Sequence, residues 1–77
     1  MEIKFTRHAR RQMKWRKITE EEVVVAVNSP DRLEATTKGR KNAFKVIAGR
    51  LLRVTYAFRN SEAVVITALV KLRENEK

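Results

Sequence analysis

The hydrophobic periodicity of this chain changes at Asn28-Ser29-Pro30, and this change constrains the fold more than any other feature of the sequence. Before Pro30 the apolar residues recur three or four positions apart, which is typical of amphipathic helices. After it they alternate with polar residues, which is typical of strands with one buried face. Helices followed by strands predict an α+β domain whose helices pack on one face of a twisted sheet. The other face of that sheet is then the expected place for a ligand.

The segment before Pro30 predicts a short strand and a first helix. Residues 2–5 alternate polar and apolar side chains, and Thr6 is a suitable N-cap for a helix that follows. At 100° per residue, one narrow sector holds Phe5, Ala9, Met13 and Arg16. We therefore expect this sector to face the core and Arg16 to bury the aliphatic part of its side chain there.

A second helix is predicted to begin after Thr19. Thr19 and Glu22 have the spacing of a capping box, and residues 20–22 place three glutamates at the positive end of the helix dipole. The apolar stripe of this helix consists of Val23, Val24 and Val27. Consecutive valines favour a strand by propensity. The cap before them and Asn28-Ser29-Pro30 after them nevertheless bound a helical segment.

Four strands are predicted after Pro30, at residues 31–37, 42–48, 51–58 and 63–70. We expect a turn at Lys38-Gly39-Arg40, a two-residue hairpin loop at Gly49-Arg50 and a turn at residues 59–62. Alternation places Phe44, Val46 and Ala48 on one face of the second of these strands. It places Leu52, Val54, Tyr56 and Phe58 on the inward face of the third. The last strand is apolar on both faces, so we expect it to be central.

Together these elements predict one α+β domain over residues 1–72, followed by a charged tail at residues 73–77. The predicted architecture is a short N-terminal strand, two helices and then a four-stranded antiparallel meander. A single domain of this length buries only about 60% of the surface that its unfolded chain exposes. We therefore expect a small core without an enclosed substrate cavity.

The balance of charge indicates the class of ligand. The chain holds 18 Lys and Arg against 9 Asp and Glu, a formal net charge of +9. Self-repulsion on this scale is destabilising unless a polyanion is nearby, so nucleic acid is the leading partner class and an acidic protein the second. Acidic residues are absent from Ile3–Thr19 and from Ala35–Ser61, and each window holds seven Lys or Arg. The alternative is a solvated surface rich in charges of both signs, as in many thermophile proteins.

The same composition argues against several classes of site. The absence of Cys excludes disulfides and thiolate metal sites, and a single His without a nearby carboxylate argues against any metal. No glycine-rich phosphate loop, carboxylate pair or serine-hydrolase motif occurs, and we expect no cofactor. The N-terminus lacks a signal-peptide pattern, and no stretch approaches the ~20 apolar residues that span a bilayer. We expect a cytoplasmic protein without a membrane partner.

The first helix brings three chemically distinct side chains to one flank: His8, Arg11 and Trp15. A cation, an indole ring and an imidazole on one flank are suited to hold an unstacked RNA base and its phosphate, since stacking contributes about 1–3 kcal/mol per base. The alternative for Trp15 is that it covers the edge of the core. We predict that Arg11 and Trp15 bind nucleic acid.

His8 is the only side chain here that ordinarily titrates near neutrality. It lies in the first turn between Arg7 and Arg11, where the helix dipole and the neighbouring cations favour the neutral imidazole. A neutral imidazole can accept the proton of a ribose 2′-hydroxyl. Alternatively, His8 donates a hydrogen bond to a strand carbonyl and fixes the helix to the sheet. A second set of candidate nucleic-acid ligands lies on the strands and at the C-terminus: Lys45, Arg50, Arg53, Lys71 and Arg73.

The order of short motifs resembles a small prokaryotic family, the domain of unknown function 4258. The resemblance lies in His8-Ala9-Arg10, Met13, Arg16, Ile18-Thr19, Glu22-Val23, Asn28-Ser29-Pro30 and the strand Val64–Thr67. Gln12 stands where the family commonly has arginine, and Lys17 where it commonly has glycine. This family is similar in element order to the RelE/ParE and BrnT toxin superfamily.

The resemblance implies a basic RelE-like toxin-fold domain that binds RNA or the ribosome, or binds another target. It implies an acidic antitoxin-like protein as a second partner. It also implies a metal-independent endoribonuclease, with His8 and Arg16 as the two candidate catalytic residues that match the family pattern. The last strand ends in VKLRENEK and lacks the Tyr or His that nuclease members commonly carry there. The alternative is a non-enzymatic nucleic-acid- or protein-binding module of the same fold.

Overall fold

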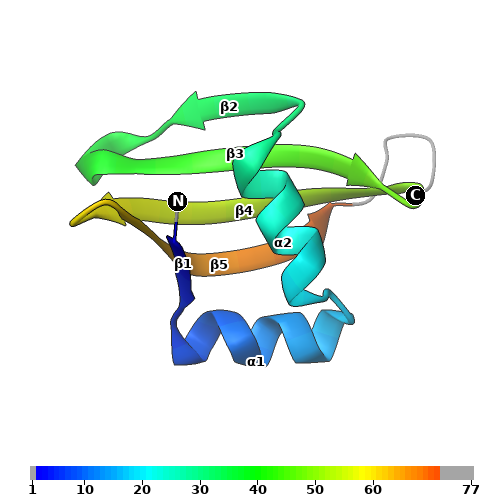
Figure 1. Ribbon diagram of the computed structural model, residues 1–77. Helices are drawn as coiled ribbons and strands as arrows, with labels where there is room; N and C mark the ends of the chain where they lie inside the picture. The colour runs from blue at the N-terminus through cyan, green and yellow to red at the C-terminus, as the bar shows by residue number, and fades with distance from the viewer. Residues whose placement is uncertain (1, 72–77) are drawn as a thin grey trace.

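The computed structural model describes residues 2–71 and has an α+β fold (Figure 1). In chain order its elements are β1 (Glu2–Phe5), α1 (Arg7–Arg16), α2 (Glu20–Asn28), β2 (Arg32–Ala35), a short 3-10 helix (Thr37–Gly39), β3 (Arg40–Ile47), β4 (Arg50–Arg59) and β5 (Glu62–Lys71). The predicted class is confirmed, as is the order of two helices before the main strands. The predicted domain end at residue 72 and the tail at 73–77, which includes Arg73, lie outside the described residues.

The sheet has five strands in the order β1-β5-β4-β3-β2. Strands β2 to β5 pair antiparallel with their neighbours, whereas β1 pairs parallel with β5 and places Ile3 opposite Ala63. The sheet is therefore mixed and five-stranded, because β1 joins it through partners far away in the sequence. No local pattern encodes such a pairing. Strand β5 lies between β1 and β4, and a β-bulge opposite Thr55 and Tyr56 shifts its register.

The two helices occupy different places against this sheet (Figure 1). Helix α2 crosses one face of the sheet. Helix α1 follows the short strand β1 and lies beside β5, which it contacts. The expectation that both helices cover one face is therefore met only by α2. The core lies between α2, α1 and the sheet, and its fully buried members include Ala9, Val23, Leu52, Val54 and Val65.

The helix starts follow the predicted caps. Thr6 Oγ1 accepts a hydrogen bond from the Ala9 N–H at 3.0 Å. Thr19 Oγ1 accepts one from the Glu22 N–H at 3.1 Å, and Glu22 Oε1 accepts one from the Thr19 N–H at 2.9 Å, so the capping box is complete. Both caps satisfy amide donors that have no partner within the helix.

The hairpin turns correct two local predictions. Ala48 and Gly49 have φ values of 53° and 79°, and Ile47 faces Arg50 across the hairpin. Positive φ at both central residues is the pattern of a type I′ turn. The loop is therefore Ala48-Gly49, one residue earlier than the predicted Gly49-Arg50, and Ala48 does not belong to the strand.

The faces of β3 and β4 agree only in part with the alternation in the sequence. Leu52, Val54 and Tyr56 are buried toward the helices as predicted, but Phe58 near the end of β4 is 56% exposed. In β3 it is the small Ala43 that faces the helices and is buried. Phe44 and Val46 lie on the opposite face, which we call the outer face. Apolar alternation defined two faces of β3 but did not indicate which one α2 covers.

Within residues 2–71 no helix is long and apolar enough to span a bilayer.

Candidate nucleic-acid interface

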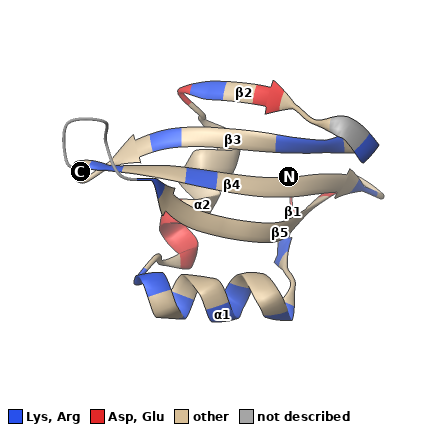
Figure 2. Ribbon diagram, turned by 180° about the vertical axis from the view of Figure 1, so that it is seen from behind, with Lys and Arg blue, Asp and Glu red and all other residues tan. Residues whose placement is uncertain are grey.

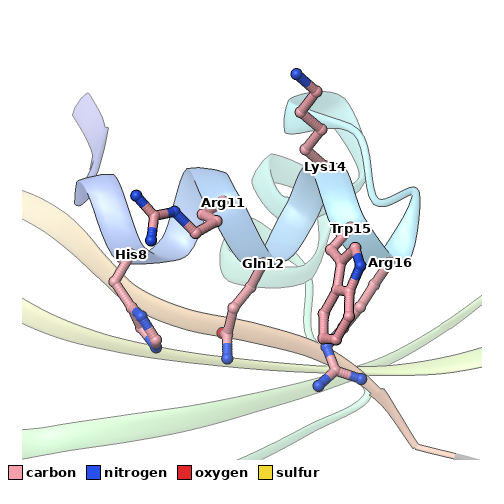
Figure 3. A pocket seen from close by; sticks show the side chains of 6 residues that line it. All are labelled: His8, Arg11, Gln12, Lys14, Trp15 and Arg16. Atoms are coloured by element: carbon pink, nitrogen blue, oxygen red, sulfur yellow. The ribbon is translucent and has the colours of Figure 1, made fainter.

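An open hollow of about 720 Å³ lies along one flank of α1 (Figure 3). Its lining residues all come from this helix: His8, Arg11, Gln12, Lys14, Trp15 and Arg16. We call it the α1 hollow. His8, Gln12 and Arg16 are four residues apart and therefore form one row along the helix, with Trp15 beside them. The structure thus places the predicted trio of His8, Arg11 and Trp15 around a single concave surface.

Contacts at both ends fix α1 in this position. At the start, the Thr6 N–H donates to the Val65 carbonyl at 3.1 Å, and Thr6 Oγ1 donates to the Ile66 carbonyl at 3.4 Å. At the end, Lys17 adopts a left-handed conformation with φ 59°, and the Ile18 N–H donates to the Met13 carbonyl at 2.8 Å. Because its ends and its apolar face are held, the exposed flank has a defined orientation.

Arg10 shows which way the α1 hollow faces. Its guanidinium pairs with Glu20 at the start of α2, so this flank of α1 faces α2. On a helical wheel the row of His8 and Gln12 lies on the other side of the buried Ala9 and Met13. The α1 hollow therefore opens toward the outer face of the sheet, and Figure 3 shows these side chains in front of β5 with α2 behind.

Trp15 is the most exposed of the large hydrophobic residues, with 82% of its surface accessible. It makes no ring contact, hydrogen bond or cation–π contact within residues 2–71. The alternative that Trp15 covers the edge of the core is therefore wrong. An indole ring left in water loses the free energy that its burial would contribute, so Trp15 does not stabilise the core.

The two candidate catalytic residues are both exposed, and neither behaves as a structural residue. His8 makes no hydrogen bond within the described part of the chain, so the alternative of a histidine that fixes the helix to a strand carbonyl is not borne out. Arg16 was expected to bury its stem in the core, which is wrong. The chain reverses at Lys17, and Ile18, 5% exposed, fills the core position beyond the helix end.

Two lining residues of the α1 hollow were missed by sequence reasoning, namely Gln12 and Lys14. The Gln12 side-chain oxygen is buried without a hydrogen-bond partner in the described chain, and its amide group projects between His8 and Arg16. Helical spacing alone could have found Gln12, because it lies four residues from each of these neighbours. The family pattern did not indicate Gln12, because arginine is common at this position.

The cations of the strands divide between the two faces of the sheet. Lys45 pairs with Asp31 at 3.2 Å. Arg50 pairs with Glu22 of α2 at 2.7 Å and donates to the Lys17 carbonyl at 3.3 Å. These two predicted nucleic-acid ligands are therefore engaged in the fold, and they do not lie with Arg53 and Lys71.

Arg53 and Lys71 lie on the outer face, which is turned to the viewer in Figure 2, where α2 lies behind the sheet. Both line a second hollow of about 350 Å³, whose other lining residues are Asp31, Arg32, Glu34, Asn42, Phe44, Val46 and Leu51. We call it the outer hollow. Arg53 and Lys71 form no ion pair within residues 2–71, and the Arg53 Nε is buried without a partner. At the rim, the Arg32 guanidinium lies 5.0 Å from the centre of the Phe44 ring and pairs with Glu34.

Glu22 and Asp31 have shifted pKa values, and each interacts with a backbone N–H and a paired cation of the fold rather than with an unpaired cation of either hollow. The Thr19 backbone N–H is the main cause that lowers the pKa of Glu22 below its usual value; burial opposes it, and Arg50 lowers the pKa further. The Val46 backbone N–H, followed by Lys45, lowers the pKa of Asp31. Among residues 2–71 no group of three His, Asp or Glu side chains is arranged to hold a metal ion.

The family model described as "Domain of unknown function (DUF4258)" matches residues 5–70, which is most of the chain. The chain belongs to this family, as its motif order predicted. No curated protein and no solved structure is significantly similar to it.

Proposed function

We propose that this chain binds single-stranded RNA through the α1 hollow, as a domain of the RelE-like toxin type. The observation that supports this most directly is Trp15, which is 82% exposed and lies among cations that pair with no carboxylate in the described chain. An exposed aromatic ring among unpaired cations is the arrangement that single-strand-binding proteins use. The ring stacks on a base, and the cations hold the adjoining phosphates.

The geometry favours a single strand over a duplex. Base faces are hidden by stacking inside an A-form helix, so an indole ring reaches them only where bases are splayed out. From His8 to Trp15 the flank extends about 10 Å, at ~1.5 Å per residue. This is the length of about three stacked nucleotides at ~3.4 Å each. The α1 hollow therefore accommodates a short unpaired segment.

Cleavage is the further step that His8 would supply. The neutral imidazole takes the proton of a ribose 2′-hydroxyl, and the freed oxygen attacks the adjacent phosphorus. The bond to the 5′-oxygen breaks, and that oxygen takes a proton from solvent at this open site. The products are a 2′,3′-cyclic phosphate and a 5′-hydroxyl end, without a metal ion. Arg11 and Arg16, on either side of His8 and Gln12, would balance the charge that develops on the phosphate.

The fold class is consistent with this proposal. In the RelE/ParE and BrnT superfamily, which this family resembles in element order, two N-terminal helices also precede the sheet, and a member binds RNA or the ribosome as an endoribonuclease, or binds another target. In the same proposal, an acidic antitoxin-like protein neutralises the domain by competing for its cations.

Binding without cleavage is the second candidate, and one observation favours it. No described group holds a hydrogen bond to His8 that would fix its tautomer and orientation. General bases are ordinarily oriented in this way. In this form the chain is an RNA-binding module with the same interface.

Affinity for a labelled, unstructured RNA measured by fluorescence anisotropy tests the proposed binding. Trp15→Ala removes the stacking ring, and we expect a loss of about 5- to 150-fold, corresponding to ~1–3 kcal/mol per stacked base. Trp15→Phe should recover part of it, while Val25→Ala, at an exposed apolar residue of α2, should change nothing. Equal affinity of Trp15→Ala and the unaltered chain would overturn the proposal.

Analysis of RNA ends separates the two candidates. If the domain cleaves RNA, His8→Ala should abolish the product with a 2′,3′-cyclic phosphate and leave affinity unchanged. A single strand of the same sequence with 2′-deoxyribose at every position lacks the attacking hydroxyl, so it should be bound but not cut. If no cyclic phosphate forms with the unaltered chain, the binding module is the correct form.

A further inference from the structure

The α1 hollow and the outer hollow open on the same side of the sheet, opposite α2. The row of His8 and Gln12 faces away from α2, and the outer hollow is lined by strand residues on the face that α2 does not cover. Helix α1 contacts β5, and β5 pairs with β4. Neighbouring strands are ~4.8 Å apart and a helix is about 10 Å thick, so β4 lies roughly 15 Å from the axis of α1.

The two hollows also lie toward the same end of the sheet. Arg50, at the start of β4, donates to the carbonyl of Lys17 at the end of α1. The next residue of β4, Leu51, pairs with Lys71 at the end of β5. Trp15 and Arg16 on one side and Lys71 on the other are thus at corresponding ends of α1 and β5. Lys71 is the cation of the outer hollow closest in the fold to the α1 hollow.

No carboxylate interrupts the surface between the hollows in the described chain. The outward residues of β5 and β4 on this path are Thr67, Leu69, Lys71, Leu51, Arg53 and Thr55. Asp31 and Glu34 line the outer hollow, but each is paired with a cation, Asp31 with Lys45 and Glu34 with Arg32. Glu62, at the start of β5, pairs with Lys4. The charged residues on the path from α1 are therefore Lys71 and Arg53, and both are positive.

We infer that the two hollows hold successive segments of one single-stranded RNA, so that the strand leaves Trp15, passes Lys71 and ends against Arg53 and Phe44. This inference rests on the proposed function and extends its site. Arg53 is suited to a phosphate because its guanidinium has no protein partner in the described chain, and part of it is already desolvated. Phe44, with Arg32 across its ring, supplies a second surface for a base.

RNA length tests this inference. A trinucleotide fills only the α1 hollow, whereas an RNA of about twelve nucleotides, within the ~4–16 held by other single-strand folds, reaches both hollows. The variant Arg53→Gln/Lys71→Gln should bind the long RNA at least fivefold more weakly and the trinucleotide as well as the unaltered chain does. The slope of log affinity against log salt for the long RNA should fall by about 1.4, from ~0.7 for each of two phosphate contacts.

Two controls keep the test sharp. Arg59→Gln removes a cation from the same strand and the same face as Arg53, but at the opposite end of β4. It should leave both affinities unchanged. Thermal unfolding should show that Arg53→Gln is folded, and Lys71→Gln alone, at an exposed residue, should already weaken long-RNA binding.

The outcomes distinguish this inference from the proposed function. If Trp15→Ala weakens binding and Arg53→Gln/Lys71→Gln does not, the inference fails and the proposed function stands. If neither does, both fail. If Arg59→Gln lost as much affinity for the long RNA, the overall positive charge rather than a defined path would explain binding, which also overturns the inference. The inference is also overturned if Arg53→Gln/Lys71→Gln binds the long RNA normally but no longer binds a polyglutamate peptide, since the outer hollow would then be a protein-docking site.

Discussion

Helices α1 and α2 begin alike and then use charge in opposite ways. Each starts at a threonine cap. The first turn of α2 holds three glutamates that complement the helix dipole, and two of them pair with Arg10 and Arg50. The first turn of α1 holds no acidic residue, and the cations of the α1 hollow have no carboxylate partner in the described chain.

This difference shows which charges belong to the fold. In a chain with net charge +9, the number of cations on a surface says little about function. The pairing of each cation says more, because paired cations stabilise the native structure and unpaired ones repel each other within it. A helix flank that concentrates unpaired cations departs from local stability, because Arg11, Lys14 and Arg16 repel one another without a carboxylate partner. Such departures are expected at functional sites.

The largest expected effect is on RNA affinity, and it comes from comparing two variants that each lose three cations, one set unpaired and the other paired. Arg11→Gln/Lys14→Gln/Arg16→Gln should weaken RNA binding by about tenfold to a hundredfold at ~0.1 M salt and lower the salt slope by about 2, from ~0.7 for each phosphate contact. Its unfolding temperature should change little, because no ion pair is lost and the relief of repulsion offsets the lost interaction of Lys14 and Arg16 with the helix dipole.

The matched variant is Arg32→Gln/Lys45→Gln/Arg50→Gln, which removes the same charge from residues that are already paired. It should unfold at a lower temperature and bind RNA several-fold more tightly than the first variant. Identical losses of affinity in both variants would break the comparison, since net charge alone would then explain binding.

The sequence predicted those features that depend on neighbouring residues. Both caps, both helices and the trio His8, Arg11 and Trp15 follow from spacing along one helix. Partners distant in the sequence could not be read from it. Examples are the pairing of β1 with β5 and the ion pair of Arg50 with Glu22.

Three local errors have related causes. The face of β3 was undetermined because both of its faces carry apolar residues, and close packing of α2 selected the small Ala43 over Phe44. Arg16 was misplaced because helical periodicity does not show where a helix ends and the chain reverses. Lys45 and Arg50 were grouped with Arg53 because cations on strands look alike until their partners are known.

A smaller effect is expected from Glu22→Gln, which tests whether the charges of α2 are structural. The substitution removes the charge that pairs with Arg50 and weakens the acceptor of the Thr19 N–H. We expect a loss of about 1 kcal/mol of stability, as for other helix caps. This lowers the unfolding temperature of a domain of this size by roughly 4–8 °C. RNA affinity should not change, and a loss of affinity at full stability would contradict the division of roles.

Glu22 also gives the direction of a pH effect. The Thr19 N–H and Arg50 lower the pKa of Glu22 below its ordinary value of 4.5 in the folded chain. The unfolded chain therefore takes up the proton first as the pH falls. The stabilisation is complete above that ordinary value and is lost as the pH falls through the lower folded pKa. Melting curves from about pH 6 to about pH 3 should show a smaller decline for Glu22→Gln than for the unaltered chain.

The smallest expected effect is an exchange of charge between the two helix starts. Arg7 is exposed at the first position of α1, outside the α1 hollow, and Glu21 is exposed in the first turn of α2 without an ion pair in the described chain. Arg7→Glu should stabilise the domain and Glu21→Arg should destabilise it, each by about 0.3–1 kcal/mol, because only the sign of the charge near the dipole changes. Chemical denaturation at low salt measures both. If Arg7→Glu destabilised the fold, the basic start of α1 would itself be structural, and the contrast between the two helices would not hold.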